Sequence, residues 1–535
     1  MKKSRYTDFR SFREKILSQE KNQISIPSEA LLSIALVFPN SYAVGMANLG
    51  FQAIYRLFNE FPGVRCERAF LYEQFPGVTR TLESGEQLRN FDIIAFSISY
   101  ELDFPNLVQI LINAGITPFS EKRHHLEPLV MAGGVIAFLN PTPIARFIDF
   151  FYLGEIEPQL QSLLLLLIQS KQEQWQKREI LEKLNEADEI YVPEIHDKNK
   201  KLKKVYQSPQ ESSPQYSPVI SPDSHFKNMF LIEVGRGCGR HCHFCAASHV
   251  YHPFRIFSDD SILNIIQTFC QDTKRIGLIG AALSDYPRLH HLCSELVEQG
   301  YELGLSSFRL DAIYPNFLKI LERGKIKTLT FAPEAGTERL RNLIHKNLSD
   351  EQILDAAHAI ADSQINQVKL YFIIGLPGET DEDIAGIVFM IEKIQKIFRK
   401  NRGLNSITVS VNAFIPKSFT PFQWSPMARD FEIRRKRKYL EREFKNIPGV
   451  RFNRKSVKEE ILQSIFSLGD QKIAEAIYHK IKNNVDWQTA WQQTGIDLNL
   501  ILYQSRKFED DLSWDFMEYG ISKERLWRIR ENGVI

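Results

Sequence analysis

Two stretches of alternating strand-like and helix-like segments most limit the folds open to this chain. Short apolar runs recur between longer amphipathic stretches, first over residues 31–170 and again over residues 228–426. Parallel strands need a crossover between them, usually a helix, so this alternation predicts α/β domains built on parallel sheets. With 535 residues the chain is too long for one core, and two or three domains are expected.

The first alternation predicts a doubly wound, Rossmann-like domain over residues 31–170, after an N-terminal extension of residues 1–30. The expected strands are 31–38, 64–70, 91–97, 128–133 and 147–153, and the expected helices are 47–58, 104–114 and 157–169. Ligands of such sheets bind beyond the carboxyl ends of the strands. Here those ends carry Asn40, Gly133-Gly134 and Gly154-Glu155-Ile156-Glu157.

Residues 171–227 interrupt the rhythm. They contain a basic run, Lys198 to Lys204, and a stretch rich in Ser and Pro, Ser208 to Ser224. This composition favours a solvated linker, and an RNA-contacting arm is the alternative.

The second alternation predicts a partial (β/α)6 barrel of the TIM type over residues 228–426. The expected strands are 231–234, 276–281, 301–306, 328–331, 367–373 and 407–414, and the expected helices are 259–270, 288–299, 316–322, 349–361 and 381–398. The active end of such a barrel is formed by the loops that follow the strands. Residues 427–535 have no strand rhythm, which predicts a small α-helical C-terminal region.

Composition narrows the classes of protein. A net charge of +2 gives no general case for nucleic-acid or membrane binding. No secretory signal follows the basic start, and no apolar run is long enough to span a bilayer. Three of the six cysteines fall within eight positions, a pattern typical of a metal site in a reducing compartment. We therefore expect a cytoplasmic protein.

Those three cysteines, Cys238, Cys242 and Cys245, have the spacing C-x3-C-x2-C and follow the first strand of the expected barrel. Three thiolates this close can bind three irons of a [4Fe-4S] cluster and leave the fourth iron open to another ligand. A zinc knuckle that recruits nearby histidines is the alternative, although this cysteine spacing fits zinc poorly. The candidate histidines are His241, His243, His249 and His252.

With the aromatic Phe244 before the third cysteine, this motif resembles the signature of radical S-adenosylmethionine (SAM) enzymes. The resemblance implies that SAM chelates the open iron. It also implies that an electron, supplied by a donor such as flavodoxin or ferredoxin, cleaves SAM to methionine and a 5′-deoxyadenosyl radical. That radical then abstracts a hydrogen from a substrate, which the sequence does not identify.

The resemblance also assigns SAM contacts at the ends of the second and third barrel strands. The backbone of Gly280 and Ala281 corresponds to the segment that meets the SAM amino group, although the glutamate common there is missing. Ser307, Arg309 and Asp311 lie in the polar segment that meets ribose and carboxylate. Arg309 is our candidate for the methionine carboxylate, and a salt bridge from Arg309 to Asp311 is the alternative.

Further contacts follow the fourth and fifth strands. Glu334 is expected either to point into the barrel mouth or to cap the helix that begins near Thr337. Gly375 and Gly378, with Ile373, resemble the adenine-side segment of the subgroup that contains the methylthiotransferases. Glycine there permits close backbone approach to the purine.

The front domain resembles the cobalamin-binding domains fused to many radical SAM enzymes. The loop Asn40 to Asn48 lacks the histidine motif that ligates cobalt, so cobalamin is expected either to bind without a protein ligand or to be absent. A second cluster like that of the methylthiotransferases is excluded, because Cys66 is the only cysteine of the front domain. The alternatives to a cobalamin-independent enzyme are a cobalamin-dependent methyltransferase and a non-catalytic iron–sulfur or zinc module that senses redox state or binds RNA.

Overall fold

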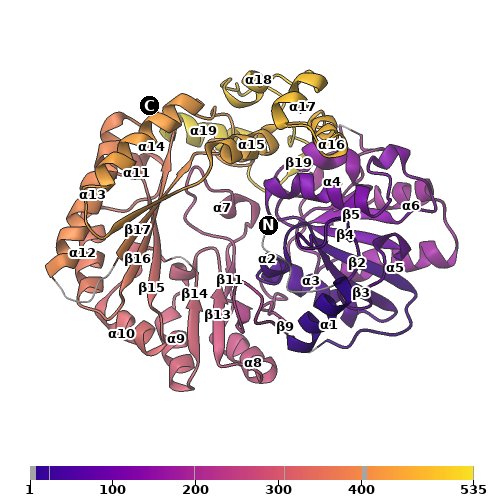
Figure 1. The fold of residues 1–535 in the computed structure, drawn as a ribbon, viewed down its shortest axis with the longest axis horizontal. Coiled ribbons are helices and arrows are strands. Elements are labelled where there is room, and N and C mark those ends of the chain that lie inside the picture. Colours follow the sequence, from indigo (N-terminus) through magenta and orange to yellow (C-terminus); the bar gives the residue numbers. More distant parts are fainter. Residues whose placement is uncertain (1–7, 23, 198, 307, 401–405, 534–535) are drawn as a thin grey trace.

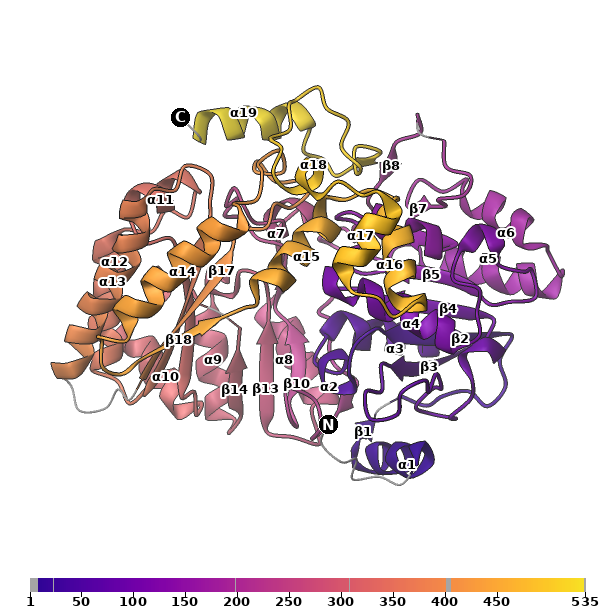
Figure 2. The ribbon, with the colours of Figure 1, turned by 45° about the horizontal axis from the view of Figure 1, so that its top comes forward.

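The computed structural model describes residues 8–22, 24–197, 199–306, 308–400 and 406–533. Two α/β domains lie side by side, and the C-terminal helices cross above both of them (Figure 1; Figure 2). The predicted fold class, a doubly wound domain followed by a partial barrel, is confirmed.

The front domain is built on a six-stranded sheet in the order β3-β2-β4-β5-β6-β7. Its strands are β2 (Leu32–Phe38), β3 (Val64–Phe70), β4 (Ile93–Ser97), β5 (Leu129–Gly133), β6 (Phe150–Tyr152) and β7 (Ile190–Tyr191). Pairing is parallel except between β6 and β7. The chain leaves β2 toward β3 on one side and returns to β4 on the other, so the winding reverses between β2 and β4. Ligands of open α/β sheets bind at such a reversal.

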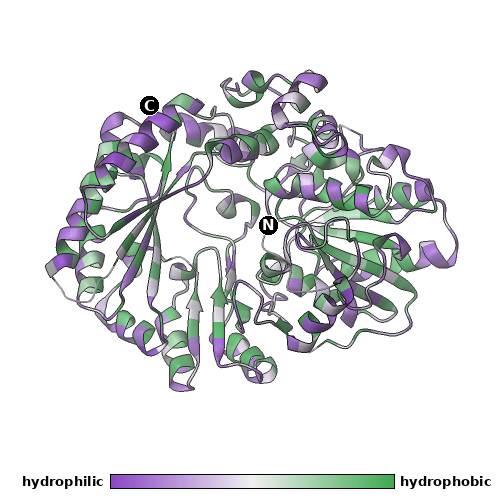
Figure 3. Cartoon of the chain, viewed as in Figure 1, coloured by the Kyte–Doolittle hydropathy of each residue, from purple (hydrophilic) through white to green (hydrophobic). Residues whose placement is uncertain are grey.

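Helices cover both faces of this sheet. They are α3 (Leu49–Glu60), α4 (Phe104–Asn113), α5 (Leu160–Gln172) and α6 (Lys177–Leu184). The buried strands are mainly apolar, as expected for a parallel sheet covered on both sides, and the exception is β3 with its buried Glu67 and Arg68 (Figure 3). In the N-terminal extension, Phe12 and Ile16 of α1 (Phe9–Gln19) are buried against the domain.

The segment expected to be a linker begins inside the front domain. Helix α6 packs onto its core, and β7 forms the edge of its sheet. Further on, β8 (Leu202–Lys203) pairs with β19 (Met517–Glu518), and β9 (Val219–Ile220) pairs with β1 (Lys21–Asn22). These strands of two residues give no periodic signal in the sequence, because long-range pairing alone defines them.

The barrel consists of two parallel sheets, β10-β13-β14 and β15-β16-β17-β18. Its strands are β10 (Phe230–Glu233), β13 (Arg275–Ile279), β14 (Glu302–Leu305), β15 (Thr328–Glu334), β16 (Gln367–Ile374), β17 (Ser406–Ala413) and β18 (Val450–Arg454). A parallel bridge between Phe308 and Phe331 joins the two sheets.

An outer layer of helices covers these strands. It comprises α8 (Asp259–Phe269), α9 (Leu289–Glu298), α10 (Pro315–Arg323), α11 (Glu338–Leu343), α12 (Asp350–Ala361), α13 (Asp381–Lys400) and α14 (Asp430–Phe444).

The C-terminal region is mainly helical, as predicted, but it also adds β18 as a seventh barrel strand and β19. Its remaining helices are α15 (Val457–Leu468), α16 (Ile473–Lys482), α17 (Trp487–Thr494), α18 (Leu498–Leu502) and α19 (Lys523–Gly533). The region joins the two domains: Asn140 of the front domain donates to the carbonyl of Ser467 at 3.1 Å, and Tyr100 donates to Gln463 at 3.2 Å. No helix in the described ranges is both long and apolar enough to cross a membrane.

Candidate functional site

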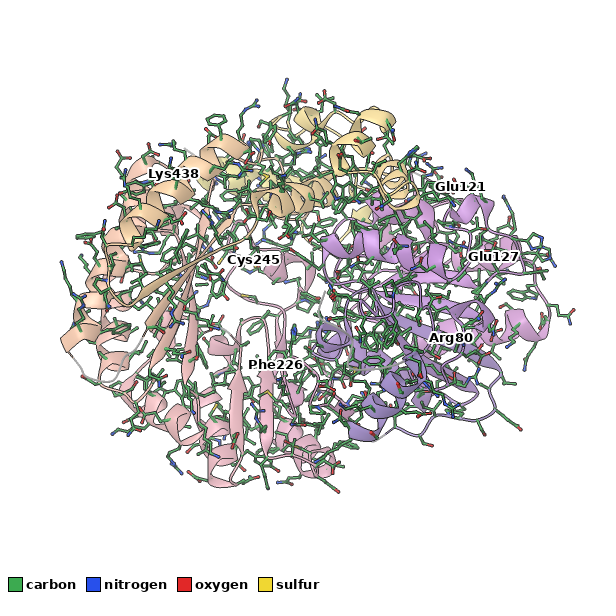
Figure 4. All side chains as sticks on the ribbon, viewed as in Figure 1. Arg80, Glu121, Glu127, Phe226, Cys245 and Lys438 are labelled. Atoms are coloured by element: carbon green, nitrogen blue, oxygen red, sulfur yellow. The ribbon has the colours of Figure 1, made fainter. Side chains whose placement is uncertain are left out.

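The three cysteines lie on a loop that leaves the carboxyl end of β10. A short antiparallel pair, β11 (Gly235–Arg236) with β12 (Arg255–Ile256), closes the base of this loop, which also contains α7 (Ala247–Val250). Gly237 adopts a φ of 84°, and a Cβ atom there would come within 2.4 Å of the Tyr251 carbonyl oxygen. Glycine is therefore required where the loop turns toward Cys238. Cys245 lies near the centre of the molecule, on the side of the barrel that faces the front domain (Figure 4).

The three thiols are partly or fully buried and lie close enough to influence one another. Burial raises the pKa of Cys242 to about 11, with added contributions from Cys245 and Cys238. Burial also raises the pKa of Cys238 and of Cys245. A metal that binds these sulfurs must therefore displace their protons. In the described ranges no three His, Cys, Asp or Glu side chains converge to hold a single ion. A cluster needs its thiolates around it, each on its own iron, so the donor set fits an iron–sulfur cluster.

A second loop, following α11, lies against the cysteine loop and contributes a cation that sequence reasoning missed. His243 donates its backbone N–H to the Ile344 carbonyl at 3.0 Å, and a His345 ring nitrogen lies 3.0 Å from the Arg240 carbonyl. The next residue, Lys346, is near enough to lower the pKa of all three thiols. No motif marked Lys346 in the sequence, since its role depends on where α11 ends.

Glu334, at the end of β15, is the partner of Lys346, with 3.4 Å between carboxylate and ammonium. Burial raises the pKa of Glu334 despite that neighbour. Its φ of 71° is uncommon for a residue with a side chain. The helix cap is made instead by Thr337, whose side chain accepts from the N–H of Leu340. The Glu334 carboxylate therefore pairs with Lys346 and does not cap helix α11.

The segment after β16 forms a turn with two glycines in the left-handed region, Gly375 at φ 80° and Gly378 at φ 75°. The Gly375 N–H donates to both carboxylate oxygens of Glu379, at 2.9 and 3.0 Å. Glu379 is in turn paired with Lys436 of α14 at 2.5 Å. Helix α14 of the C-terminal region therefore fixes the turn that the sequence assigned to the adenine side.

The other predicted SAM contacts are distributed around the same mouth. Phe244 and Ile373 pack together against a small apolar cluster whose buried members include Leu376 and Phe422. Arg309 makes a two-point ion pair with Asp311, at 2.9 and 2.7 Å, which is the alternative arrangement considered for it. Ser307 lies outside the described residues.

Gly280 and Ala281 line the barrel side of a cavity of about 580 Å3 between the two domains. The front-domain side of this cavity is formed by the carboxyl ends of β2, β4 and β5, where the winding of the sheet reverses. Phe226, which also lines it, lies between the domains (Figure 4). Its volume is within the range of cofactor sites. A Cβ built on Gly133 meets no atom within 4 Å, so a side chain there would occupy the cavity.

An ion-pair network connects this cavity to the cysteine loop. The buried carboxylate of Glu155 accepts hydrogen bonds from Arg255 and, at 2.9 Å, from the N–H of Gln207, and it forms an ion pair with Arg236 at 2.8 Å. Arg236 also pairs with Glu157 at 3.1 Å and Glu233 at 2.8 Å. Because Arg236 precedes Gly237-Cys238, the network holds the start of the cysteine loop against the front domain.

Burial disfavours the charged form of two histidines beside the cysteines. Burial lowers the pKa of His249 to about 3 and that of His243 to about 4. Neither ring nitrogen of His249 has a hydrogen-bond partner among the described residues. The rings of His243 and His345 are stacked with centroids 5.3 Å apart.

The fold and the site together define a two-domain α/β protein that presents three cysteines at the mouth of an open barrel. Residues 232–391 match the family model for the radical SAM superfamily, and residues 50–193 match that for radical SAM proteins, N-terminal. An uncharacterized protein of Methanocaldococcus jannaschii is 30% identical over 487 residues, which cover 90% of this chain and 98% of that protein. The chain therefore belongs to the radical SAM superfamily, which implies a [4Fe-4S] cluster and SAM.

More distant similarities are partial. The ribosomal protein uS12 methylthiotransferase of Thermodesulfovibrio yellowstonii is 23% identical over 263 residues, 45% of this chain and 60% of that protein. A tRNA-2-methylthio-N(6)-dimethylallyladenosine synthase of Acidithiobacillus ferrooxidans is 25% identical over 180 residues, covering 31% and 40% of the two chains. The chain thus spans less than two thirds of these methylthiotransferases.

The structure of the cobalamin-dependent SAM radical enzyme OxsB, with aqua-cobalamin and SAM bound, superposes with a TM-score of 0.50. The identity is 15%, and the match covers 94% of this chain and 78% of that one. At this identity the likeness concerns the fold alone, including the order of the front domain and the barrel.

Proposed function

We propose that this protein reductively cleaves SAM at a [4Fe-4S] cluster held by Cys238, Cys242 and Cys245, and that the 5′-deoxyadenosyl radical acts on a substrate in the barrel. When bound, the cluster supplies the electron that breaks the C–S bond of SAM. The observation that carries the proposal is the position of the three thiols at the barrel mouth, facing the Glu334–Lys346 pair. A one-electron donor such as flavodoxin or ferredoxin is the expected partner.

Each SAM group has a candidate partner at this mouth. Lys346 is the better candidate for the methionine carboxylate, since Asp311 already satisfies the Arg309 guanidinium on two points. The turn Gly375 to Gly378, with Ile373, offers backbone and an apolar side chain to the adenine. Phe244, next to the third cysteine in the chain, packs against the same apolar cluster as Ile373.

The test is anaerobic reconstitution with iron and sulfide, followed by addition of dithionite and SAM. We expect iron–sulfur absorption, a reduced-cluster EPR signal and release of 5′-deoxyadenosine, measured by mass spectrometry. Cys242→Ala should abolish the four-iron signal, whereas the buried Cys270→Ala, in a helix-end position away from the loop, should retain it. Cluster-loaded protein that never cleaves SAM would contradict the proposal, and one zinc per chain without iron would favour a non-catalytic module.

A second candidate is the cobalamin-dependent variant of this chemistry, and the cavity between the domains favours it. The cavity adjoins both the switch point of the front sheet and the start of the cysteine loop at Gly237. Its lining is largely apolar, and no histidine lies among the described residues that line it. A corrinoid there would be held by backbone and apolar contacts without a protein ligand to cobalt.

Gly133→Trp tests this candidate, since its side chain would fill the cavity from an uncrowded backbone position. We expect wild-type protein to retain hydroxocobalamin through gel filtration, with the corrinoid visible by absorption. The Gly133→Trp variant should retain none while keeping its iron–sulfur absorption. Absence of corrinoid on wild-type protein removes the methyltransferase variant and leaves the first proposal intact.

A further inference from the structure

The inner face of the barrel is exposed to solvent along β16 and β18. Burial in β16 alternates strictly at its start: Val368, Leu370 and Phe372 are buried beneath the outer helices, whereas Gln367, Lys369 and Tyr371 are exposed. Successive side chains of a strand point to opposite faces, so the exposed set faces the barrel interior. Barrels of this size are normally filled by side chains. Here the inward-facing side chains of β16 are exposed instead of being packed against one another.

Strand register places polar side chains side by side on that face. Thr330 of β15, Lys369 of β16, Thr408 of β17 and Arg451 of β18 are successive cross-strand partners, and we call them the Lys369–Arg451 row. Lys369 and Arg451 are exposed, and the two threonines are half-buried. Hydrophilic colour on β16 and β17 marks these polar positions (Figure 3).

A second row lies one step nearer the mouth. Tyr371, Ser410 and Asn453 are cross-strand partners in β16, β17 and β18. This row adds a phenol, a hydroxyl and an amide to the inner face. These uncharged hydrogen-bonding groups lie between the Lys369–Arg451 row and the mouth of the barrel.

Neither cation of the Lys369–Arg451 row has an acidic partner among the described residues. The carboxylates of neighbouring barrel strands are engaged elsewhere: Glu334 with Lys346, Glu233 with Arg236, and Glu302 with Lys325. The sheet β10-β13-β14 presents a different surface, where Gly277 and Gly304 are in register and Met229 and Leu231 pack over them. The positive charge of the row is thus uncompensated within the barrel.

We propose that the Lys369–Arg451 row binds an anionic group of the substrate, a phosphate or a carboxylate, and therefore that the substrate is a polar, water-soluble anion. This inference rests on the proposed function, whose substrate it describes. Lys369 and Arg451 flank Thr408 from strands whose backbones are ~10 Å apart, so their side chains can meet above its hydroxyl. Two cations and the Thr408 hydroxyl between them match the acceptors of one oxyanion.

The row also fixes the length of the substrate. Lys369 precedes Ile373 by four residues on one strand, a separation of ~13 Å along the barrel axis. The anionic group therefore binds that far below the adenine side of the mouth. From there the substrate extends toward the thiols and passes Tyr371 and Asn453. Because this face of the barrel is polar, we expect it to exclude an apolar lipid tail.

Inorganic phosphate and acetate are the probes. We would titrate each by calorimetry into cluster-loaded full-length protein saturated with SAM, so that Lys346 and the cluster are already occupied. Wild-type protein should bind phosphate, and Lys369→Gln and Arg451→Gln should each weaken binding about tenfold, as expected for one charge-assisted contact. Lys319→Gln is the matched control, because Lys319 is exposed on α10 in the outer helical layer and its replacement should leave phosphate affinity unchanged.

Each outcome decides a separate point. Binding of phosphate alone assigns a phosphorylated substrate, and binding of acetate as well extends the class to carboxylates. Failure of wild-type protein to bind either anion, or equal binding by Lys369→Gln and Arg451→Gln, overturns the inference. Because 5′-deoxyadenosine release is measured separately on wild-type protein, a failed anion site remains distinguishable from a protein that does not cleave SAM.

Discussion

Replacing Glu155 by alanine should destabilise the contact between the front domain and the cysteine loop. The carboxylate is buried and is the acidic partner of Arg255, whose side chain is 3% exposed. Without it, the hydrogen bonds that remain to Arg255 among the described residues go to the neutral carbonyls of Pro253 and Gln207. Arg236 is less affected, because Glu157 and Glu233 remain. The cost is therefore that of one uncompensated buried cation, about 3–5 kcal/mol.

Thermal unfolding followed by fluorescence measures this cost. For a unit of 150–250 residues, about 3–5 kcal/mol corresponds to a decrease in Tm of roughly 6–20 °C. Glu155→Gln, which keeps an acceptor oxygen, should lose less. Glu157→Ala is the matched control: Arg236 retains two carboxylates, so we expect a loss of about 1 kcal/mol or less. A Tm of Glu155→Ala within 2 °C of the control would refute the reasoning.

The same network predicts a pH window. Burial alone would raise the pKa of Glu155, but the Arg255 hydrogen bond and the Arg236 charge outweigh it and lower that pKa below its ordinary value of 4.5. A carboxyl whose pKa is lowered by folding contributes stability above its unfolded pKa and loses it as the pH falls through the folded value. The Tm difference between wild type and Glu155→Gln should thus be full at pH 7 and shrink below about pH 4.5.

Two further predictions concern other elements. Burial raises the pKa of Asp103 to about 6, so ionisation of this carboxyl costs stability as the pH rises from about 4 to 6. In urea unfolding at pH 7, Asp103→Asn should therefore be more stable than wild type by up to about 3 kcal/mol. Equal stability of the two proteins at pH 7 would count against this prediction. Gly336→Ala would place a Cβ 2.2 Å from the Asp383 carbonyl oxygen of α13 and should lower the free energy of unfolding by at least about 1–3 kcal/mol. The control is Gly133→Ala, whose Cβ meets no atom within 4 Å and which should leave the free energy of unfolding almost unchanged.

Much of the fold follows from local pattern. The five parallel front strands and six barrel strands expected from apolar runs are present, with ends shifted by a few residues. What the pattern missed were elements defined by pairing rather than composition. Strand β18 reads Val450-Arg451-Phe452-Asn453-Arg454, with no apolar run, and it is a strand because all five residues are in register with β17.

Among the site residues, those with motifs were accessible to sequence reasoning and those without were not. The cysteine spacing and the glycine turn after β16 place Cys238 to Cys245 and Gly375 at one mouth. Lys346 carries no motif, because its proximity to the thiols depends on the packing of the α11 loop on the cysteine loop. Arg309 could be assigned two roles from sequence, and only the side-chain geometry shows its pair with Asp311.

The sequence by itself determined the chemistry that this protein can hold. Three cysteines at this spacing, on a loop after a strand, predict an iron–sulfur site, because ligand identity and spacing are local properties of the chain. Only the tertiary structure decided what surrounds that site. Residues 155, 236 and 255 meet in one buried network, and residues 330, 369, 408 and 451 form one row, because domain docking and strand register set these contacts across long stretches of chain. Such register depends on burial of the opposite face of each strand, which no local pattern of charges encodes.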